Sequence, residues 1–341
     1  MTMGIQRRQV IGGLITATLL ASSAYSARTQ PRQQVKFLFD VLANPKHALF
    51  YPSAKKGFFE AQGLDVTIES GKGSADVIQK IASGAAQFGF ADASAVVLGR
   101  TRDLPVSLVA MVHYKTLMSI ISRKASAIER PADLVGKRIA STSGDSVRLV
   151  MPAFARLNGF DADKVNFLTV NQPAKASMLL AGQVDGVCDY LSALPVYREA
   201  AKAANLELQA LEYANHGLDI YSNGIVVHDD LLRSSPALVK SFVRAIVQGL
   251  EFAAAERAST VEIFRGYQPQ YSEAVTREGL DIAADHLLVP EVASGGIGSM
   301  SAGKMERTIK ITVEAYGLAK GPDAGTVYTN AMLPGIFPRK V

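Results

Sequence analysis

One group of polar side chains that could carry chemistry follows the apolar run 35–39. The group contains Asp40, Asn44 and His47. A carboxylate accepts hydrogen bonds only, an amide donates and accepts them, and a histidine ring does either according to its tautomer. Such a set suits the edge of a small planar molecule with mixed donors and acceptors, for example an aminopyrimidine. Asp40 and Asn44 could instead cap and shape their own loop, as these residue types often do.

A second group contains Gly73, Ser74 and Asp92. Gly73 lets the backbone approach another molecule closely, and Ser74 falls where a helix is expected to begin, so that free N–H groups point outward. The triplet Gly71-Lys72-Gly73 is not followed by the third glycine of a dinucleotide fingerprint. Asp92 ends the apolar run 88–91 and is expected at the same edge. Helix capping is an alternative role for Ser74 that is compatible with ligand contact.

A third group is the run Ser143, Gly144, Asp145 and Ser146, which precedes a helix expected to continue through Leu157. Small residues at a helix N-terminus favour a carboxylate, sulfonate or phosphate. Asp145 would repel such an anion and favours an amine or a ring N–H instead. The fragment Gly-Asp-Ser also occurs in serine hydrolases. A nucleophilic serine needs a poised histidine base, however, and the C-terminal Asp-x-x-His pattern of the lipase type is missing.

Two further residues complete the candidate ligand-binding set. Tyr190 follows the apolar run 184–188 and could stack on a planar ligand while its hydroxyl forms a hydrogen bond. A tyrosine at the edge of the core is the alternative. Asn223 lies near an expected crossing between two lobes. We predict no metal site, because the five histidines show no ligand spacing with one another or with Cys188. We also predict no catalytic residue and no cofactor.

The elements that must position these groups alternate along the chain. Apolar runs of strand length are separated by helical segments of about ten residues or more, which indicates parallel βαβ units and an α/β fold. In open sheets of this kind, ligands bind at the carboxyl ends of the strands. From Pro236 onward the chain is predicted to be mostly helical. The predicted strands cover residues 35–39, 66–68, 88–91, 106–111, 117–121, 138–140, 165–170 and 184–188.

Composition and charge exclude some classes of function. Lys and Arg outnumber Asp and Glu, 36 to 31, but the basic residues are scattered and no run exceeds Lys55-Lys56. Nucleic acid is therefore not an expected partner. A hydrophobic content of 48% supports large cores. The single cysteine, Cys188, cannot form an internal disulfide, and we expect it to be a buried core residue.

The first residues have the pattern of an export signal. Arg7 and Arg8 precede the apolar run 10–21, and the small residues of 22–27 offer a cleavage site. The apolar run is shorter than the roughly 20 residues that span a bilayer. We therefore predict a cleaved signal at residues 1–26 that uses the twin-arginine or the general secretory route, and a periplasmic location. An uncleaved membrane anchor is the alternative.

Short motifs between Val35 and Asp92 carry a family resemblance. They are Asp40 followed by Asn44-Pro45-Lys46-His47, then Gly57-Phe58-Phe59, Gly63-Leu64-Asp65-Val66, Gly73-Ser74-Ala75-Asp76 and Ala82-Ser83-Gly84. The segment resembles the first lobe of periplasmic solute-binding proteins of the thiamine-pyrimidine-precursor type, relatives of the sulfonate- and taurine-binding proteins. The resemblance implies a type II periplasmic-binding-protein fold with a two-strand hinge. Lobe 1 would comprise residues 27–115 and 223–341, including C-terminal helices, and lobe 2 residues 116–222.

The resemblance also implies a role. A protein of this family would be the binding component of an ABC importer, a monomer that captures a small planar solute and presents it to a permease. A thiamine pyrimidine precursor is the favoured solute. Family members usually have a tryptophan directly after the aspartate and a glycine two residues after the histidine, where this chain has Val41 and Leu49. Sulfonates, flavins and aromatic carboxylates are therefore alternative ligands.

A related enzyme provides the alternative to transport. The eukaryotic thiamine-pyrimidine synthase is similar in fold and uses a pyridoxal lysine, a histidine and a cysteine-rich iron motif. The positions of this chain that match its lysine and its histidine are Ala91 and Ala95, and the chain has one cysteine. The comparison favours a binding protein, and no enzymatic activity is expected.

Overall fold

The computed structural model describes residue 1 and residues 31–143 and 145–335. Apart from Met1, the predicted export signal lies outside the described residues, and so does Gly144. All elements below belong to the compact unit that begins at Arg32. Within the described ranges, no helix has the length and apolar character needed to cross a membrane.

The first sheet has five strands in the order β2-β1-β3-β10-β4. Strand β1 pairs in parallel with β2 and β3, whereas β10 runs antiparallel to both β3 and β4. The start of β10 therefore lies at the same edge as the carboxyl ends of β1 and β3. The strands are β1 (Gln33–Phe39), β2 (Leu64–Ser70), β3 (Phe88–Asp92), β4 (Val106–Met111) and β10 (Asn223–His228).

The second sheet repeats this arrangement in the order β7-β6-β8-β5-β9. Here β5 runs antiparallel to β8 and β9, and β6 pairs in parallel with β7 and β8. The two mixed sheets confirm the predicted α/β fold class, while the lobe boundaries remain predictions. The strands are β5 (Met118–Arg123), β6 (Arg138–Ser141), β7 (Asn166–Thr169), β8 (Gly186–Tyr190) and β9 (Leu208–Glu212).

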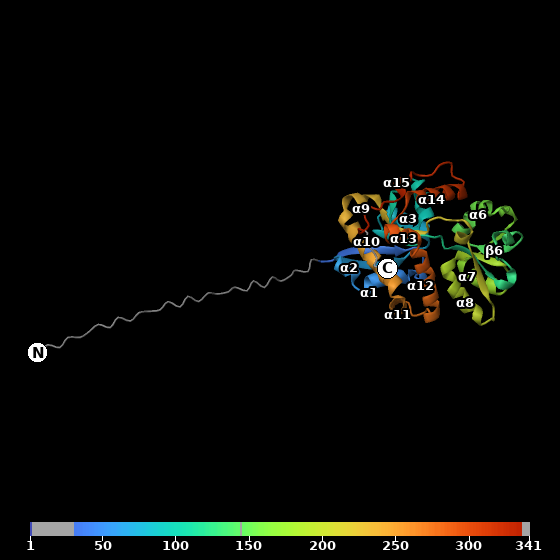
Figure 1. Ribbon diagram of the computed structural model, residues 1–341, viewed down its shortest axis with the longest axis horizontal. Helices are drawn as coiled ribbons and strands as arrows, with labels where there is room; N and C mark the ends of the chain where they lie inside the picture. The colour runs from blue at the N-terminus through green and yellow to red at the C-terminus, as the bar shows by residue number, and fades with distance from the viewer. Residues whose placement is uncertain (2–30, 144, 336–341) are drawn as a thin grey trace. The chain divides into compact units, whose positions relative to one another are not determined.

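Helices follow most strands, and those of the second sheet, α6 to α8, gather beside β6 (Figure 1). The long α10 begins at Pro236, where the sequence predicted a helix start. The 3₁₀ helix η1 spans Pro45–Phe50. The α-helices are α1 (Tyr51–Lys55), α2 (Phe58–Ala61), α3 (Ser74–Ala82), α4 (Ala93–Arg100), α5 (Ser146–Leu149), α6 (Met151–Asn158), α7 (Gln172–Leu180), α8 (Leu194–Lys202), α9 (Asp229–Ser234), α10 (Pro236–Ala255), α11 (Arg257–Tyr267), α12 (Glu273–Leu287), α13 (Pro290–Gly295), α14 (Ala302–Ala315) and α15 (Ala324–Val327).

One prediction about the helices is wrong. The helix expected to continue through Leu157 is divided at Val150 into α5 and α6. Pro152 lies in the first turn of α6, where its missing N–H group costs nothing, but in a continuous helix the same residue would remove an internal hydrogen bond. The proline therefore accounts for the break.

Phe242 of α10 holds the helix against the first sheet. Its ring stacks on Phe88 of β3 with centroids 3.7 Å apart and an interplanar angle of 9°. Phe37 of β1 and Phe59 of α2 also contact the ring, at 5.3 and 5.6 Å. All four side chains are buried. This packing joins α10 to β1 and β3, whose carboxyl ends carry the candidate site.

Cys188 lies in β8 and is fully buried, as the sequence predicted. Burial is the main cause that raises the pKa of its thiol well above the usual range, and the nearby Asp145 adds to the effect. The thiol is therefore a small core group rather than a nucleophile.

Candidate functional site

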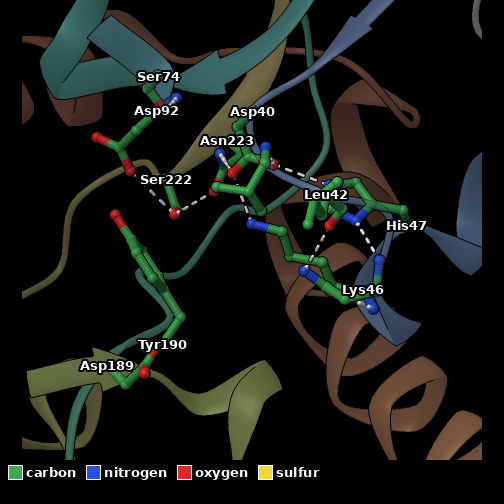
Figure 2. Close-up of polar contacts among 12 residues, drawn as sticks. Asp40, Leu42, Lys46, His47, Ser74, Asp92, Asp189, Tyr190, Ser222 and Asn223 are labelled. Carbon is green, nitrogen blue, oxygen red and sulfur yellow. Dashed lines mark hydrogen bonds and ion pairs between the residues drawn. The ribbon is translucent and has the colours of Figure 1, made fainter. Parts of the chain in front are cut away.

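The candidate site lies where β1, β3 and β10 meet at one edge of the first sheet (Figure 2). Asp40 directly follows β1, Asp92 ends β3, and Asn223 begins β10. The three side chains are buried. Because β10 is antiparallel to β3, its first residue reaches the same edge as the last residue of β3, and Asn223 indeed pairs with Asp92 in register.

Asp40 is the centre of a buried network. The Lys46 Nζ lies 2.6 Å from one Asp40 carboxylate oxygen, and the His47 Nε2 lies 2.8 Å from the other. The Asn223 amide donates a further hydrogen bond to Asp40 over 3.2 Å. Burial by itself would raise the pKa of the carboxyl group, but Lys46 and His47 outweigh it and hold that pKa below its usual range. Asp40 is therefore a carboxylate with several partners.

Asn44 sets the geometry of this network rather than belonging to it. Its side chain accepts a hydrogen bond from the Lys46 N–H and so caps η1, while its own N–H donates to the His47 Nδ1 over 3.1 Å. With Nδ1 occupied as an acceptor, the proton of a neutral imidazole must be on Nε2, which faces Asp40. Burial lowers the pKa of His47 and favours this neutral form. Asn44 therefore caps and shapes its own loop, which was the alternative to ligand contact.

Asp92 is a buried carboxylate without an ion-pair partner among the described residues. It caps α4 by accepting from the Ser94 N–H over 2.9 Å and accepts from the Ser222 hydroxyl over 3.2 Å. Burial is the main cause that raises its pKa. The Asp92 N–H donates to the Ser74 hydroxyl over 3.0 Å, so Ser74 supports the end of β3.

Gly73 is needed where β2 turns into α3. Its φ of +115° is a backbone conformation that side chains with a Cβ rarely adopt, and its N–H donates to the Asp40 carbonyl over 2.6 Å. The loop is thereby tied to the end of β1. Gly73 and Ser74 thus hold the edge of the sheet in place.

The second sheet contributes a similar ion pair. Asp145 caps α5 by accepting from the Val147 N–H over 3.0 Å, and it lies 2.9 Å from the Lys175 Nζ. Lys175 also donates to the Cys188 carbonyl over 2.6 Å, and its side chain is buried. Asp145 is therefore already neutralised by a cation, which the sequence did not reveal. Ser143 is exposed and lies outside this pair.

Tyr190, at the end of β8 in the second sheet, contacts the Asp40 network beside the first sheet. The Lys46 Nζ lies 5.3 Å from the centre of its ring, a cation–π distance. Its hydroxyl points toward Asp92 and Ser222 (Figure 2). Burial raises the pKa of Tyr190 well above its usual range, with Asp92, Asp40 and Asp145 adding to the effect and the Ser146 hydroxyl opposing it. The hydroxyl is therefore a neutral donor among three carboxylates.

Sequence reasoning missed the two buried lysines and Ser222. Lys46 falls inside the Asn-Pro-Lys-His motif, but nothing in its position distinguishes it from an exposed lysine of a loop. Lys175 pairs with Asp145 across 30 residues of sequence, a long-range contact that no local pattern encodes. Asp189, next to Tyr190, is a further buried carboxylate; it accepts from the Tyr197 hydroxyl and from the Tyr190 N–H.

In the part of the chain that the structure describes, no group of three or more His, Cys, Asp or Glu side chains could hold a metal ion. His47 uses both ring nitrogens in the contacts described above.

Solved structures with the same architecture define the fold. The alkanesulfonate-binding protein SsuA from Xanthomonas axonopodis pv. citri, bound to MOPS, has a TM-score of 0.68 and is 15% identical; the match covers 87% of this chain and 98% of that one. The fold is thus that of the periplasmic binding proteins. Residues 44–259 match the model of the NMT1/THI5-like family, and the chain belongs to that family.

Proteins with related sequences fall into two classes, binding proteins and synthases. A formylaminopyrimidine-binding protein of Halalkalibacterium halodurans is 23% identical over 84% of this chain and 88% of that protein. The riboflavin-binding protein RibY of Chloroflexus aurantiacus is 25% identical over 94% and 92%. A 4-amino-5-hydroxymethyl-2-methylpyrimidine phosphate synthase of Aspergillus parasiticus is 21% identical over 72% and 74%. The relatives thus include both binding proteins and synthases.

Proposed function

We propose that this protein is the exported solute-binding component of an ABC importer. It captures a small planar solute between its two sheets and presents it to a permease at the inner membrane, as a monomer in the periplasm. The observation that carries the proposal is the meeting of Lys46, from the first sheet, with the Tyr190 ring, from the second, at 5.3 Å. Side chains of both sheets thus converge on one place, as a closing binding protein requires.

The site residues divide into those that contact solute and those that support them. Tyr190 stacks on the planar solute, and Asp92, Asn223 and Ser146 form hydrogen bonds to it. Asp40 holds the Lys46 ammonium at 2.6 Å, and His47 in turn contacts the other Asp40 oxygen at 2.8 Å. The supporting positions, which shape the loops around the solute, are Asn44, Gly73, Ser74, Ser143 and Asp145; Gly144 lies outside the described residues.

A thiamine pyrimidine precursor is the favoured solute. Its ring is planar and carries both donors and acceptors. The side chains of Asp92 and Asn223, beside the first sheet, and of Ser146, beside the second, also include donors and acceptors. The formylaminopyrimidine-binding relative supports this choice. The riboflavin-binding relative keeps flavins as an alternative, and the alkanesulfonate-binding protein of the same fold keeps sulfonates. Aromatic carboxylates are a further alternative.

The proposed function is tested by thermal unfolding of the purified protein with single solutes. The panel contains aminopyrimidines, flavins, sulfonates and aromatic carboxylates. A solute present at 100 times its Kd should stabilise the folded protein by about 2.7 kcal/mol, because it binds the folded state alone. A panel in which no compound raises the midpoint of unfolding would contradict the proposal.

The residues present do not fit the pyridoxal phosphate of a synthase. Ala91 and Ala95 occupy the positions expected for the lysine and the histidine. The buried lysines near the site, Lys46 and Lys175, are each within 3 Å of a carboxylate, at 2.6 and 2.9 Å. Attack on the aldehyde requires a free amine, whereas each of these amino groups is held against a carboxylate. We therefore propose that the protein binds its solute without catalysing a reaction on it.

This distinction predicts a spectroscopic result. Purified protein mixed with pyridoxal phosphate should show the spectrum of the free aldehyde, without the absorbance band of a lysine Schiff base. Treatment with borohydride followed by peptide mass spectrometry should find no modified site lysine. A stoichiometric band that disappears when Lys46 or Lys175 is replaced by Met would contradict the non-enzymatic interpretation.

A further inference from the structure

The charges around Tyr190 do not balance. The first sheet contributes Asp40 and Asp92 with one lysine, Lys46, and the second contributes Asp145 and Asp189 with one lysine, Lys175. Each lysine is paired with one carboxylate, at 2.6 and 2.9 Å. Asp92 and Asp189 have no ion-pair partner among the described residues. Asp92 is the last residue of β3 and Asp189 the last but one of β8, and the two strands hold the same position in their sheets.

The two unpaired carboxylates differ in their surroundings. Asp189 accepts from the Tyr190 N–H at 2.8 Å, from the Tyr197 hydroxyl at 2.9 Å and from the Gln172 amide at 3.2 Å, so its oxygens are used within the second sheet and its helices. Asp92 faces the other sheet, and the Tyr190 hydroxyl points toward it (Figure 2). Asp92 is only 2% exposed and accepts from the Ser94 N–H, the Ser94 hydroxyl and the Ser222 hydroxyl, none of which carries a charge.

Burying a carboxylate without a cation costs free energy, because the charge loses its hydration. A partner that supplies positive charge or an N–H donor offsets this loss. The nearest lysine, Lys46, cannot do so fully because it lies at hydrogen-bond distance from Asp40. Arg148 lies elsewhere: its guanidinium stacks over Phe167 of β7 and donates to Thr169. Among the charged side chains described here, none neutralises Asp92.

We propose that Asp92 determines specificity by receiving an amino, ammonium or ring N–H group of the solute, with the Tyr190 ring beside it. The proposal deepens the proposed function and rests on it. It assigns to Asp92 the preference that the sequence alone suggested for Asp145, because Asp145 is occupied by Lys175. A solute that lacks such a donor would leave Asp92 unpaired and would bind weakly, whatever the rest of its structure.

The test uses two pairs of probes that differ by one amino group. The first pair is 4-amino-5-hydroxymethyl-2-methylpyrimidine and the same compound without its 4-amino group; the second is taurine and ethanesulfonate. Calorimetric titration of the full chain measures Kd for each. In the pair that binds, we expect the compound with the amino group to bind at least tenfold more tightly than the compound without it. Equal affinity within the pair that binds would overturn the inference.

A variant identifies the residue responsible. In Asp92→Asn, the amino probe should lose at least tenfold in affinity while its partner changes little, so that the ratio approaches one. The control is Asp163→Asn, at an exposed position, which should keep the wild-type ratio. Thermal unfolding verifies that both variants fold. If Asp92→Asn does not fold, the comparison of the two probes on wild-type protein still tests the inference.

The outcomes separate the inference from the function on which it rests. If Asp92→Asn folds and keeps the wild-type ratio, Asp92 is not the specificity determinant, although solute binding stands. If neither these probes nor any compound of the thermal-unfolding panel binds, the proposed function fails and the inference fails with it.

Discussion

Replacing Asp40 by Asn should lower the free energy of unfolding by about 3–5 kcal/mol at pH 7, because it removes one partner of a buried ion pair. The Lys46 side chain, 3% exposed, would lose its carboxylate partner, and its amino group would be costly to bury either as an unpaired ammonium or as a neutralised amine. His47 and Asn223 would also lose their charged acceptor. Urea unfolding followed by circular dichroism measures the loss.

Two comparisons make this prediction specific to the buried charge. Adding Lys46→Met to Asp40→Asn should restore part of the lost stability, because no unpaired ammonium is left. Asp230→Asn removes an ion pair with Arg233 in which both side chains are about 70% exposed, 71% and 70%, and should cost less than about 1 kcal/mol. An Asp40→Asn protein as stable as the Asp230→Asn protein would contradict the description of the network.

The contribution of Asp40 should also depend on pH. Its pKa is lowered in the folded protein, mainly because Lys46 and His47 outweigh the opposing effect of burial. A lowered pKa stabilises the folded state above the pKa of the unfolded chain, near 3.9 for Asp, and this stabilisation is lost as the pH falls toward the folded value. The difference between wild type and Asp40→Asn should therefore be constant near neutrality and shrink below about pH 4.

The second large effect is expected at Phe242. Phe242→Ala should lower the free energy of unfolding by about 3–5 kcal/mol, because it leaves a cavity among Phe37, Phe59 and Phe88 as well as removing buried apolar surface. Chemical denaturation at constant pH measures this loss. Phe252→Ala, on the same helix but only half-buried, is the matched control and should cost less. Equal costs for the two variants would show that Phe242 does not anchor α10 to the sheet.

The fold was largely predictable because its signal is local. The apolar runs 35–39, 88–91 and 138–140 lie within β1, β3 and β6, since a strand buried on both faces needs a continuous apolar sequence. The antiparallel direction of β5 and β10 was not visible in composition, because strand direction is decided by the connections rather than by the residues of the strand.

The candidate site was predictable only in part. Asp40 and Asp92 follow or end parallel strands, so their meeting at one edge of the first sheet was predictable from the sequence. Asn223 joins them because β10 runs antiparallel to β3. The partners that decide what these groups can do were not visible. The pairing of Lys175 with Asp145 depends on where α7 lies relative to α5, and the orientation of Tyr190 depends on the contact between the two sheets.

The central claim, that the protein binds a solute and releases it unchanged, is tested most directly by native mass spectrometry of the purified protein. We expect the folded chain to carry one small molecule, or to acquire one from the solute panel. Denaturation should release that molecule with its mass unchanged, and the molecule should contain an amino, ammonium or ring N–H group. A released molecule that differs in mass from the one supplied, or a folded protein that never acquires one, would contradict the account.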